Sequence, residues 1–293
     1  MELQSLMSEH PDDWGILQLQ NGILNVAKYL HDFCEEHGID YCLMGGSALG
    51  AIRHHGFIPW DDDLDVFMRP AEYEKFRMLF LDKGDRKNFY LQEWASCNGY
   101  VSYAKFRMNN SAFVEEDVKD WDIHHGIFVD IFILHTCPNS TLQRVNQYIW
   151  AKYILAKSAS NRGYVHKNKL INLLFRLLKI LPTKCMFSYA LKQVYKYDGI
   201  ESEFLCHFMG RAGIKTGLYK RNYFSNSKMV PFESIQLRVP HQVEQYLSDR
   251  WGDYMKLPSR DEISRFQHRK SWSISKAFAN YRLDCKYTDE KYL

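Results

Sequence analysis

The sequence predicts an α+β fold, in which helices flank a mixed β-sheet and a helical lobe is inserted in the middle of the chain. Short apolar segments of strand length alternate with segments of helical periodicity along residues 16–134. From residue 141 to about 197 the strand signals stop, and apolar residues recur at helical spacing among many Lys and Arg. The expected parts are an N-terminal helix that packs on the core (1–40), a main domain (41–258) and a C-terminal tail (259–293).

Composition indicates an ordinary globular protein. The 293 residues are 46% hydrophobic and 25% charged, and the formal net charge of +3 gives no reason to expect a nucleic-acid partner. Seven cysteines form an odd set without a CxxC pair, which indicates free thiols in a reducing compartment. No apolar run reaches the ~18 residues of a membrane span, and the polar N-terminus lacks a signal core. We therefore expect a cytoplasmic protein.

A strand, a glycine turn and a helix follow the N-terminal helix. Apolar residues at helical spacing predict a helix over residues 16–37, with Gly38 as its C-cap. Residues 41–44 then read as a short strand, Gly45, Gly46 and Ser47 as a turn, and residues 48–53 as a helix. Glycines let the backbone approach a ligand and a helix N-terminus presents free N–H groups, so this unit is suited to bind phosphate.

Four carboxylates occur within five residues, between two apolar runs: Asp61, Asp62, Asp63 and Asp65. So much negative charge beside apolar segments is costly unless a cation compensates it, and a divalent ion is the usual one. On a strand, Asp63 and Asp65 point to one face, while Leu64 and Val66 point to the other. We expect Asp63 and Asp65 to hold the metal, with Asp61 as an outer-shell ligand or a substrate contact. Asp62 points the other way and is expected to be structural.

These residues resemble a known family. The run GGSALGAIRHHGFIPWDDDLDV, residues 45–66, is similar to the LicD family of phosphocholine transferases and their fukutin-type relatives, in the nucleotidyltransferase-fold superfamily. A Phe-Glu before a Val-Pro hairpin, and then Trp-Gly-Asp-Tyr-Met-Lys-Leu-Pro over residues 251–258, also resemble the family's C-terminal signature. The likeness extends over residues 41–258. It implies a nucleotidyltransferase-like mixed sheet.

Two further strands complete the expected site. Residues 89–108 read as two strands joined at Asn98-Gly99, and a short strand follows at 113–115. Lys105 and Arg107 alternate with apolar residues and share one strand face, and the family's Lys/Arg strand implies that they bind phosphate.

The apolar run at residues 126–134 predicts a buried central strand, in which one aspartate, Asp130, needs a reason. Superfamily members place a third acid beside the Asp-x-Asp strand, which makes Asp130 the third metal carboxylate. His124 and His125 precede this strand; we expect surface residues, with substrate contact as the alternative.

The predicted chemistry is phosphoryl transfer assisted by one or two Mg²⁺ ions, with Mn²⁺ as an alternative. Asp63, Asp65 and Asp130 hold the metal. The groups expected to bind the donor phosphates or nucleotide are Gly45, Gly46, Ser47, Arg53, Lys105 and Arg107. By resemblance, the donor is a CDP-linked alcohol such as CDP-choline. The acceptor is a sugar hydroxyl of a cell-surface glycan or glycolipid, such as lipopolysaccharide, teichoic acid or capsule, and CMP is released.

Three alternatives remain at this point. An enzyme of the same fold could transfer a nucleoside monophosphate to a protein or small molecule. A non-catalytic module could bind metal or glycan and have lost the chemistry, although all the expected acids are present. A calcium loop would place Asp61, Asp63 and Asp65 at its first, third and fifth positions, but its sixth position must be glycine and is Val66.

The helical lobe contains one unusually apolar segment, Leu170 to Leu181. Only Asn172, Arg176 and Lys179 give it a narrow polar stripe. At ~12 residues, about 18 Å, it is too short to span a bilayer. We expect it to pack against the catalytic core. The alternative is peripheral contact with a membrane at its inner face, as basic amphipathic helices can make.

Overall fold

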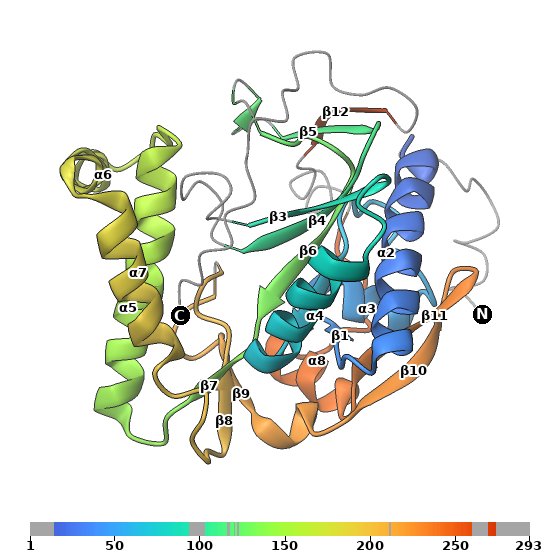
Figure 1. The fold of residues 1–293 in the computed structure, drawn as a ribbon. Helices are drawn as coiled ribbons and strands as arrows, with labels where there is room; N and C mark the ends of the chain where they lie inside the picture. Colours follow the sequence, from blue (N-terminus) through green and yellow to red (C-terminus); the bar gives the residue numbers. More distant parts are fainter. Residues whose placement is uncertain are drawn as a thin grey trace.

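The computed structural model describes residues 15–93, 103–115, 118–119, 121, 123–210, 212–259 and 269–273. Its centre is a five-stranded mixed sheet, shown in Figure 1, in the order β1–β2–β6–β4–β3. The strands are β1 (Cys42–Leu43), β2 (Asp65–Met68), β6 (Phe128–Ile133), β4 (Ala104–Met108) and β3 (Phe89–Gln92). β2 and β6 are parallel, and the other neighbours are antiparallel. This arrangement confirms the predicted α+β class and the central place of the apolar strand.

Two helices, α2 (Leu17–His37) and α4 (Pro70–Lys83), cover one face of this sheet (Figure 1). Aromatic rings make the interface: Tyr29 of α2 stacks on Phe89 at 4.2 Å, and Phe80 of α4 meets Phe106 edge-on at 5.0 Å. Such ring pairs stabilise a core beyond the area they bury. α2 confirms the helix that was predicted over residues 16–37. Gly38 ends α2 with φ 58°, the left-handed C-cap that was predicted.

A third helix, α3 (Gly45–Arg53), begins three residues earlier than expected, so the glycine turn is its first turn. α3 packs against α8 (Val243–Trp251) and against strand β10 (Ser227–Phe232), which forms a hairpin with β11 (Ile235–Pro240) as predicted. Gly50 allows a close approach. A Cβ there would lie 2.5 Å from the carbonyl oxygen of Gly56.

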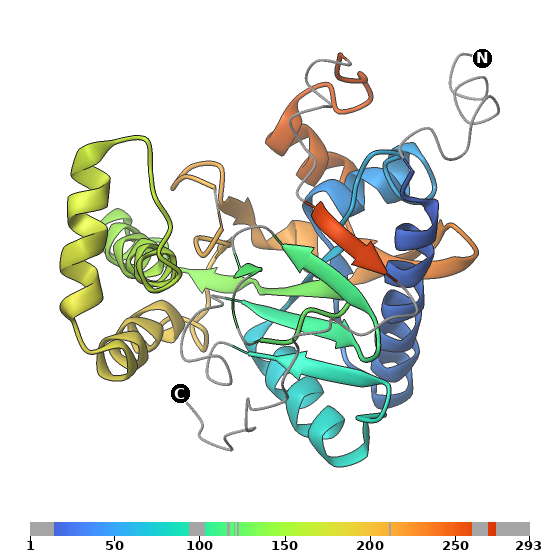
Figure 2. The ribbon, with the colours of Figure 1, turned by 90° about the horizontal axis from the view of Figure 1, so that it is seen from above.

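The inserted lobe lies to one side of the sheet, as both views show (Figures 1 and 2). It consists of α5 (Thr141–Asn161), α6 (Lys169–Ile180) and α7 (Thr183–Tyr195), which confirms the helical prediction. The lobe has a hydrophobic core of its own, which includes Ala151, Ile154, Phe187, Ala190 and Val194.

The segment after the lobe contains regular structure that the sequence did not suggest. It holds β8 (Phe204–Cys206), β9 (Leu218–Lys220) and the 3-10 helix η2 (Arg221–Phe224). The two strands extend from β7 (His135–Cys137) as a small antiparallel sheet. Three-residue strands leave too little periodicity in the sequence to be recognised.

The apolar helix α6 does not pack against the catalytic core, so that expectation was wrong. Among its residues Leu178 alone is buried, whereas Leu170 is 75% exposed and Ile180 81% exposed. α6 packs on α5, and α5 packs on α7, so the core of the lobe closes without the remaining leucines. No helix in the described ranges is long and apolar enough to cross a membrane.

Part of the C-terminal tail also has a defined place. β12 (Arg269–Ser273) pairs antiparallel with β5 (Ala112–Glu115), a role that the sequence did not suggest. The predicted turn at Asn98-Gly99 lies outside the described residues. The proposed limits of the parts of the chain, at residues 40, 258 and about 141 and 197, stay predictions.

A tight contact between two distant loops gives a test of this packing. Glu233 accepts a hydrogen bond from the Phe57 backbone at 2.9 Å, and a Cβ on Gly56 would lie 2.0 Å from the same carboxylate. We expect Gly56→Ala to lower the free energy of unfolding by about 1–3 kcal/mol, because the Glu233 side chain must move away and the Phe57 N–H loses its acceptor. Urea denaturation measures this loss. The double variant Gly56→Ala/Glu233→Ala should lose less than the sum of the two single losses; strict additivity would contradict the contact.

Candidate active site

The acidic segment before β2 is extended, with a two-residue period. The partly exposed positions are Asp61, Asp63 and Asp65, and the buried positions between and after them are Asp62, Leu64 and Val66. The predicted alternation is therefore confirmed, and it reaches back to Asp61. Three carboxylates thus lie along one side of the chain.

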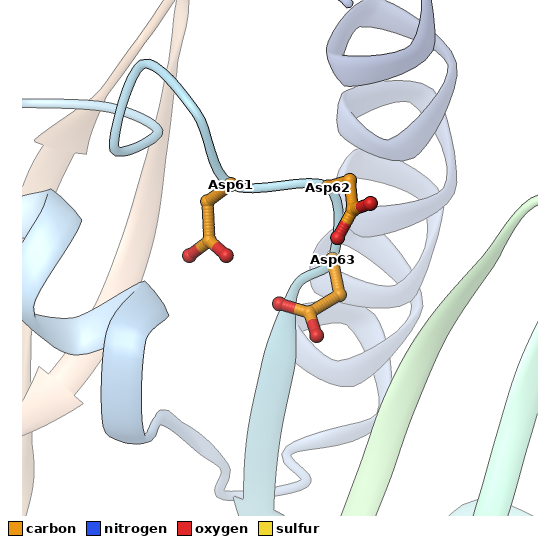
Figure 3. A group of neighbouring side chains, drawn as sticks. All are labelled: Asp61, Asp62 and Asp63. Atoms are coloured by element: carbon orange, nitrogen blue, oxygen red, sulfur yellow. The ribbon is translucent and has the colours of Figure 1, made fainter. Parts of the chain in front are cut away.

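These carboxylates are close to one another in space. One carboxylate oxygen from each of Asp61, Asp62 and Asp63 falls in a group whose members all lie within 4.8 Å. Figure 3 shows the three side chains leaving the loop in succession, with the Asp63 carboxylate extended toward the side on which Asp61 lies. Asp61, which was expected in an outer shell, and Asp62, which was expected to point away, therefore both belong to this group together with Asp63.

The register of the central sheet adds two more charged groups. Asp65 on β2 lies opposite Asp130 on β6, and Lys105 on β4 lies opposite Asp130 on its other side. The Nζ of Lys105 is 2.9 Å from Oδ1 of Asp130 and 3.2 Å from Oδ2. The backbone register thus brings together residues that are distant in the sequence.

The electrostatics of this cluster show an excess of negative charge. Burial, and then the neighbouring Asp63 and Asp130, raise the pKa of Asp65 well above its usual value. Burial and Asp63 do the same to the pKa of Asp61. Burial also raises the pKa of Asp130, to about 7, although Lys105 acts in the opposite direction. One lysine therefore leaves most of the mutual repulsion uncompensated.

A divalent cation fits this set of donors. The cluster offers carboxylate oxygens, the hard ligands that Mg²⁺ and Mn²⁺ prefer. Those of Asp61, Asp62 and Asp63 lie together, and Asp65 and Asp130 both interact electrostatically with Asp63. The raised pKa values indicate a place where positive charge is needed, which a bound cation would supply. The donor chemistry and the charge therefore agree with the predicted metal site.

The glycine turn is fixed to the acidic strand by hydrogen bonds to the backbone of Asp65. The Asp65 backbone N–H donates to the Ser47 hydroxyl oxygen at 2.8 Å, and the Met44 N–H donates to the Asp65 carbonyl at 3.0 Å. A Cβ on Gly46 would lie 3.0 Å from the Asp61 carboxylate. The first turn of α3 is therefore directly beside the carboxylates, as a phosphate-binding turn near a metal would be.

Tyr246 of α8 supports the same turn from behind. Its buried hydroxyl accepts a hydrogen bond from the Gly45 N–H at 2.9 Å. Gly45 has φ 53°, a left-handed conformation that favours glycine. Ser47 and Gly45 thus have structural contacts in addition to the predicted role in binding phosphate.

The two predicted arginines contact protein atoms in this structure. Arg107 is fully buried and donates to the Gly126 carbonyl at 2.8 Å and to the side chain of Gln92. Arg53 donates to the backbone carbonyls of Tyr254, at 2.9 Å, and Lys256, at 3.4 Å. Both residues hold distant segments onto the core. Phosphate binding by either of them stays a prediction and would require an exchange of partners.

Glu115 belongs to the site, although no role was predicted for it from the sequence. It lies 3.3 Å from Lys105 and 3.5 Å from Arg107. Burial lowers the pKa of Lys105, but Asp130 and Glu115 outweigh it, so that this lysine stays protonated. Glu115 ends a short strand that was predicted. Its two partners lie on β4, and no local pattern in the sequence reveals these contacts.

The two histidines before β6 are not surface residues, which corrects the prediction. His124 and His125 are both buried. The His124 ring stacks on Tyr90 at 5.0 Å and accepts a hydrogen bond from the Gly126 N–H at 2.9 Å. Burial lowers the pKa of His124 to about 2, so it is neutral at physiological pH. Two adjacent histidines form no repeating pattern of apolar and polar positions, so the sequence does not show that they are buried.

Comparison with known proteins agrees with this geometry. Residues 38–155 match the family described as LicD/FKTN/FKRP, nucleotidyltransferase domain. Residues 38–155 form a LicD-family domain. This domain contains the acidic cluster, the glycine turn, Lys105 and Asp130. The resemblance to the LicD family that the sequence suggested is thereby confirmed.

Two kinds of relative are informative. The lipopolysaccharide cholinephosphotransferase LicD of Haemophilus influenzae is 28% identical over 263 residues, covering 82% of this chain and 91% of the relative. The human ribitol 5-phosphate transferase FKRP is 50% identical over 40 residues, which are 14% of this chain and 8% of that protein. The first likeness extends over most of the chain, and the second is local.

The support of the glycine turn by Tyr246 can be tested directly. We expect Tyr246→Phe to lower the free energy of unfolding by about 1–3 kcal/mol, because the buried Gly45 N–H loses its acceptor. Chemical denaturation measures this loss. The matched control is Tyr189→Phe, at an exposed position of α7. Equal stability of the two variants would contradict this role for the hydroxyl.

The excess of negative charge predicts an unusual stability effect. Without divalent ions, Asp65→Asn should raise the free energy of unfolding by roughly 1 kcal/mol or more, since each unit of raised pKa corresponds to about 1.4 kcal/mol. Adding Mg²⁺ should raise the melting temperature of the wild type and have a much smaller effect on this variant. Thermal melts with and without Mg²⁺ measure both.

The control for this experiment is Asp82→Asn, at an exposed position on α4. It should behave like the wild type in both conditions. A loss of stability in metal-free Asp65→Asn, or an undiminished Mg²⁺ response, would contradict the charge cluster as the metal site.

Proposed function

We propose that the protein transfers a phospho-alcohol group from a CDP-linked donor to a sugar hydroxyl of a glycan, with release of CMP, in a metal-dependent reaction. The observation that carries this proposal is the carboxylate cluster beside the first turn of α3. Asp61 and Asp63 lie close together, and Asp65 interacts electrostatically with both of them and with Asp130, its register partner. A dense carboxylate cluster next to a phosphate-binding turn is the arrangement that phosphoryl transfer requires.

Each element has a role in this proposal. The four carboxylates would hold one or two Mg²⁺ ions, which would neutralise charge on the donor phosphates when bound. The first turn of α3 directs its N-terminus toward the same place, where backbone N–H groups favour an anion. Lys105 fixes the Asp130 carboxylate from behind and adds a positive charge near the reacting phosphates.

The reaction balances as a displacement at phosphorus. The acceptor hydroxyl oxygen forms a bond to the phosphorus distal to cytidine, the bond from that phosphorus to the bridging oxygen breaks, and CMP leaves. The hydroxyl proton passes to a carboxylate of the site, for which Asp130 is the candidate because Lys105 holds it in a fixed orientation. Attack at the other phosphorus would instead transfer the nucleotide.

The transferred group and the acceptor are argued from the relatives. The names of the Haemophilus and human proteins both describe the transfer of a phospho-alcohol, cholinephosphate in one and ribitol 5-phosphate in the other. We propose phosphocholine, because the likeness to the cholinephosphotransferase extends over 91% of that protein. That relative's acceptor, lipopolysaccharide, suggests a glycolipid acceptor here, reached from the cytoplasmic side.

The test is a product assay with CDP-choline labelled separately in the cytidine and the choline, supplied with Mg²⁺ and a crude glycolipid acceptor. We expect labelled CMP in solution and labelled choline on the acceptor. EDTA should abolish both products, Asp65→Asn should lower turnover by about 100-fold or more, and Asp82→Asn should retain full activity. Cytidine label on the acceptor would show nucleotidyl transfer instead. Full activity in EDTA or in Asp65→Asn would contradict the metal site.

A further inference from the structure

Helix α6 presents an apolar stripe that no described part of the chain covers. Its exposed residues recur with the spacing of one helical face: Leu170, Leu173, Leu174, Leu177 and Leu181, with Ile180 beside them. Each is between 41% and 81% exposed. So many large apolar side chains on one short exposed helix mark an interaction surface. Both views show α6 at the outer edge of the lobe, away from the sheet (Figures 1 and 2).

This stripe is held in place by buried polar contacts. Lys157 of α5 is fully buried, and its Nζ donates to the carbonyl oxygens of Leu178, at 2.6 Å, and Leu181, at 2.8 Å. Ser160 donates to the Phe175 carbonyl at 2.5 Å. At the other end, the Asn168 side chain caps the helix by accepting from the Leu170 N–H at 2.9 Å. The orientation of α6 on α5 is therefore fixed, and its leucine stripe is preformed.

The charge of the lobe identifies the partner. Residues 131–197 contain eleven Lys and Arg and no Asp or Glu, whereas the rest of the chain has 27 Lys and Arg against 35 Asp and Glu. Five of the eleven cations are exposed on α6 or next to its ends: Lys167, Lys169, Arg176, Lys179 and Lys184. An exposed leucine stripe flanked by cations is complementary to an anionic lipid surface.

We propose that α6 docks in the plane of an anionic membrane, with its leucines in the interface and the surrounding cations on the lipid head groups. At 12 residues the helix lies on a bilayer and does not cross it. A second copy of the chain is a poorer occupant, because two such lobes would bring eleven positive charges against eleven. Membrane docking does not depend on the proposed reaction, although it would bring the enzyme to a lipid-borne acceptor.

The test is co-sedimentation of the full chain with vesicles of phosphatidylcholine alone or of phosphatidylcholine and phosphatidylglycerol. We expect binding to the anionic vesicles that weakens as salt is raised, and little binding to the neutral ones. The double variant Leu173→Gln/Leu177→Gln should bind the anionic vesicles at least about tenfold more weakly than the wild type, because two interfacial leucines are lost. The double variant Arg176→Glu/Lys179→Glu should lose the part of the vesicle binding that weakens as salt is raised. All four positions are exposed, so the variants should fold.

The matched control is Met78→Gln, at an apolar residue on α4 that is 51% exposed and distant in sequence from the lobe. It should bind as the wild type does. Equal binding to neutral and anionic vesicles, or unchanged binding in both double variants, would overturn the proposal. It would also be overturned if the wild type bound no vesicles and sedimented as a dimer that the leucine variant abolished. Vesicle binding is measured without substrate, so its failure would leave the proposed reaction untouched.

Discussion

The parallel pairing of β2 with β6 is the constraint on which the rest of the site depends. It sets Asp65 opposite Asp130, and the antiparallel pairing with β4 sets Lys105 on the other side of Asp130. A shift of one residue in either pairing would turn these side chains to the opposite face of the sheet. The buried alternating positions, Leu64 and Val66, fix the register by packing in the core. Hydrophobic burial therefore determines where the charges converge.

The repulsion among the carboxylates requires support from outside the sheet. Gln20 of α2 donates to the backbone carbonyl of Asp61 at 3.0 Å and to that of Ile58 at 3.3 Å, which holds the loop in place. Ser47 holds Asp65 through its backbone. These bonds involve main-chain atoms of Asp61 and Asp65, so they position both residues without using their carboxylate oxygens. Rigid support of this kind lets a functional site keep a locally unfavourable arrangement.

Patterns within one element were readable from the sequence, and contacts between elements were less so. The apolar run around Asp130 predicted a buried strand with a carboxylate that needed a partner, and the strand is the central one of the sheet. The alternation at Asp63 to Val66 also held. Glu115 was missed because its contacts with Lys105 and Arg107 arise from strands that meet only in the fold. For α6, the apolar character was predicted correctly, but the helix packs on α5 and not on the catalytic core as predicted. Periodicity shows that a face is apolar, but the rest of the fold determines what covers it.

The separation of charge along the chain gives the two halves of the molecule different preferences. The acidic cluster lies in the sheet domain, and that part of the sequence has more acids than bases, whereas the lobe is purely basic among its charged residues other than histidine. Near an anionic surface, the sheet domain would be repelled and the lobe attracted, so electrostatics alone would favour one orientation of the molecule. In that orientation the leucines of α6 would meet the surface first. Lys157 binds the end of α6 to α5, so the lobe would transmit that orientation to the sheet as one packed body.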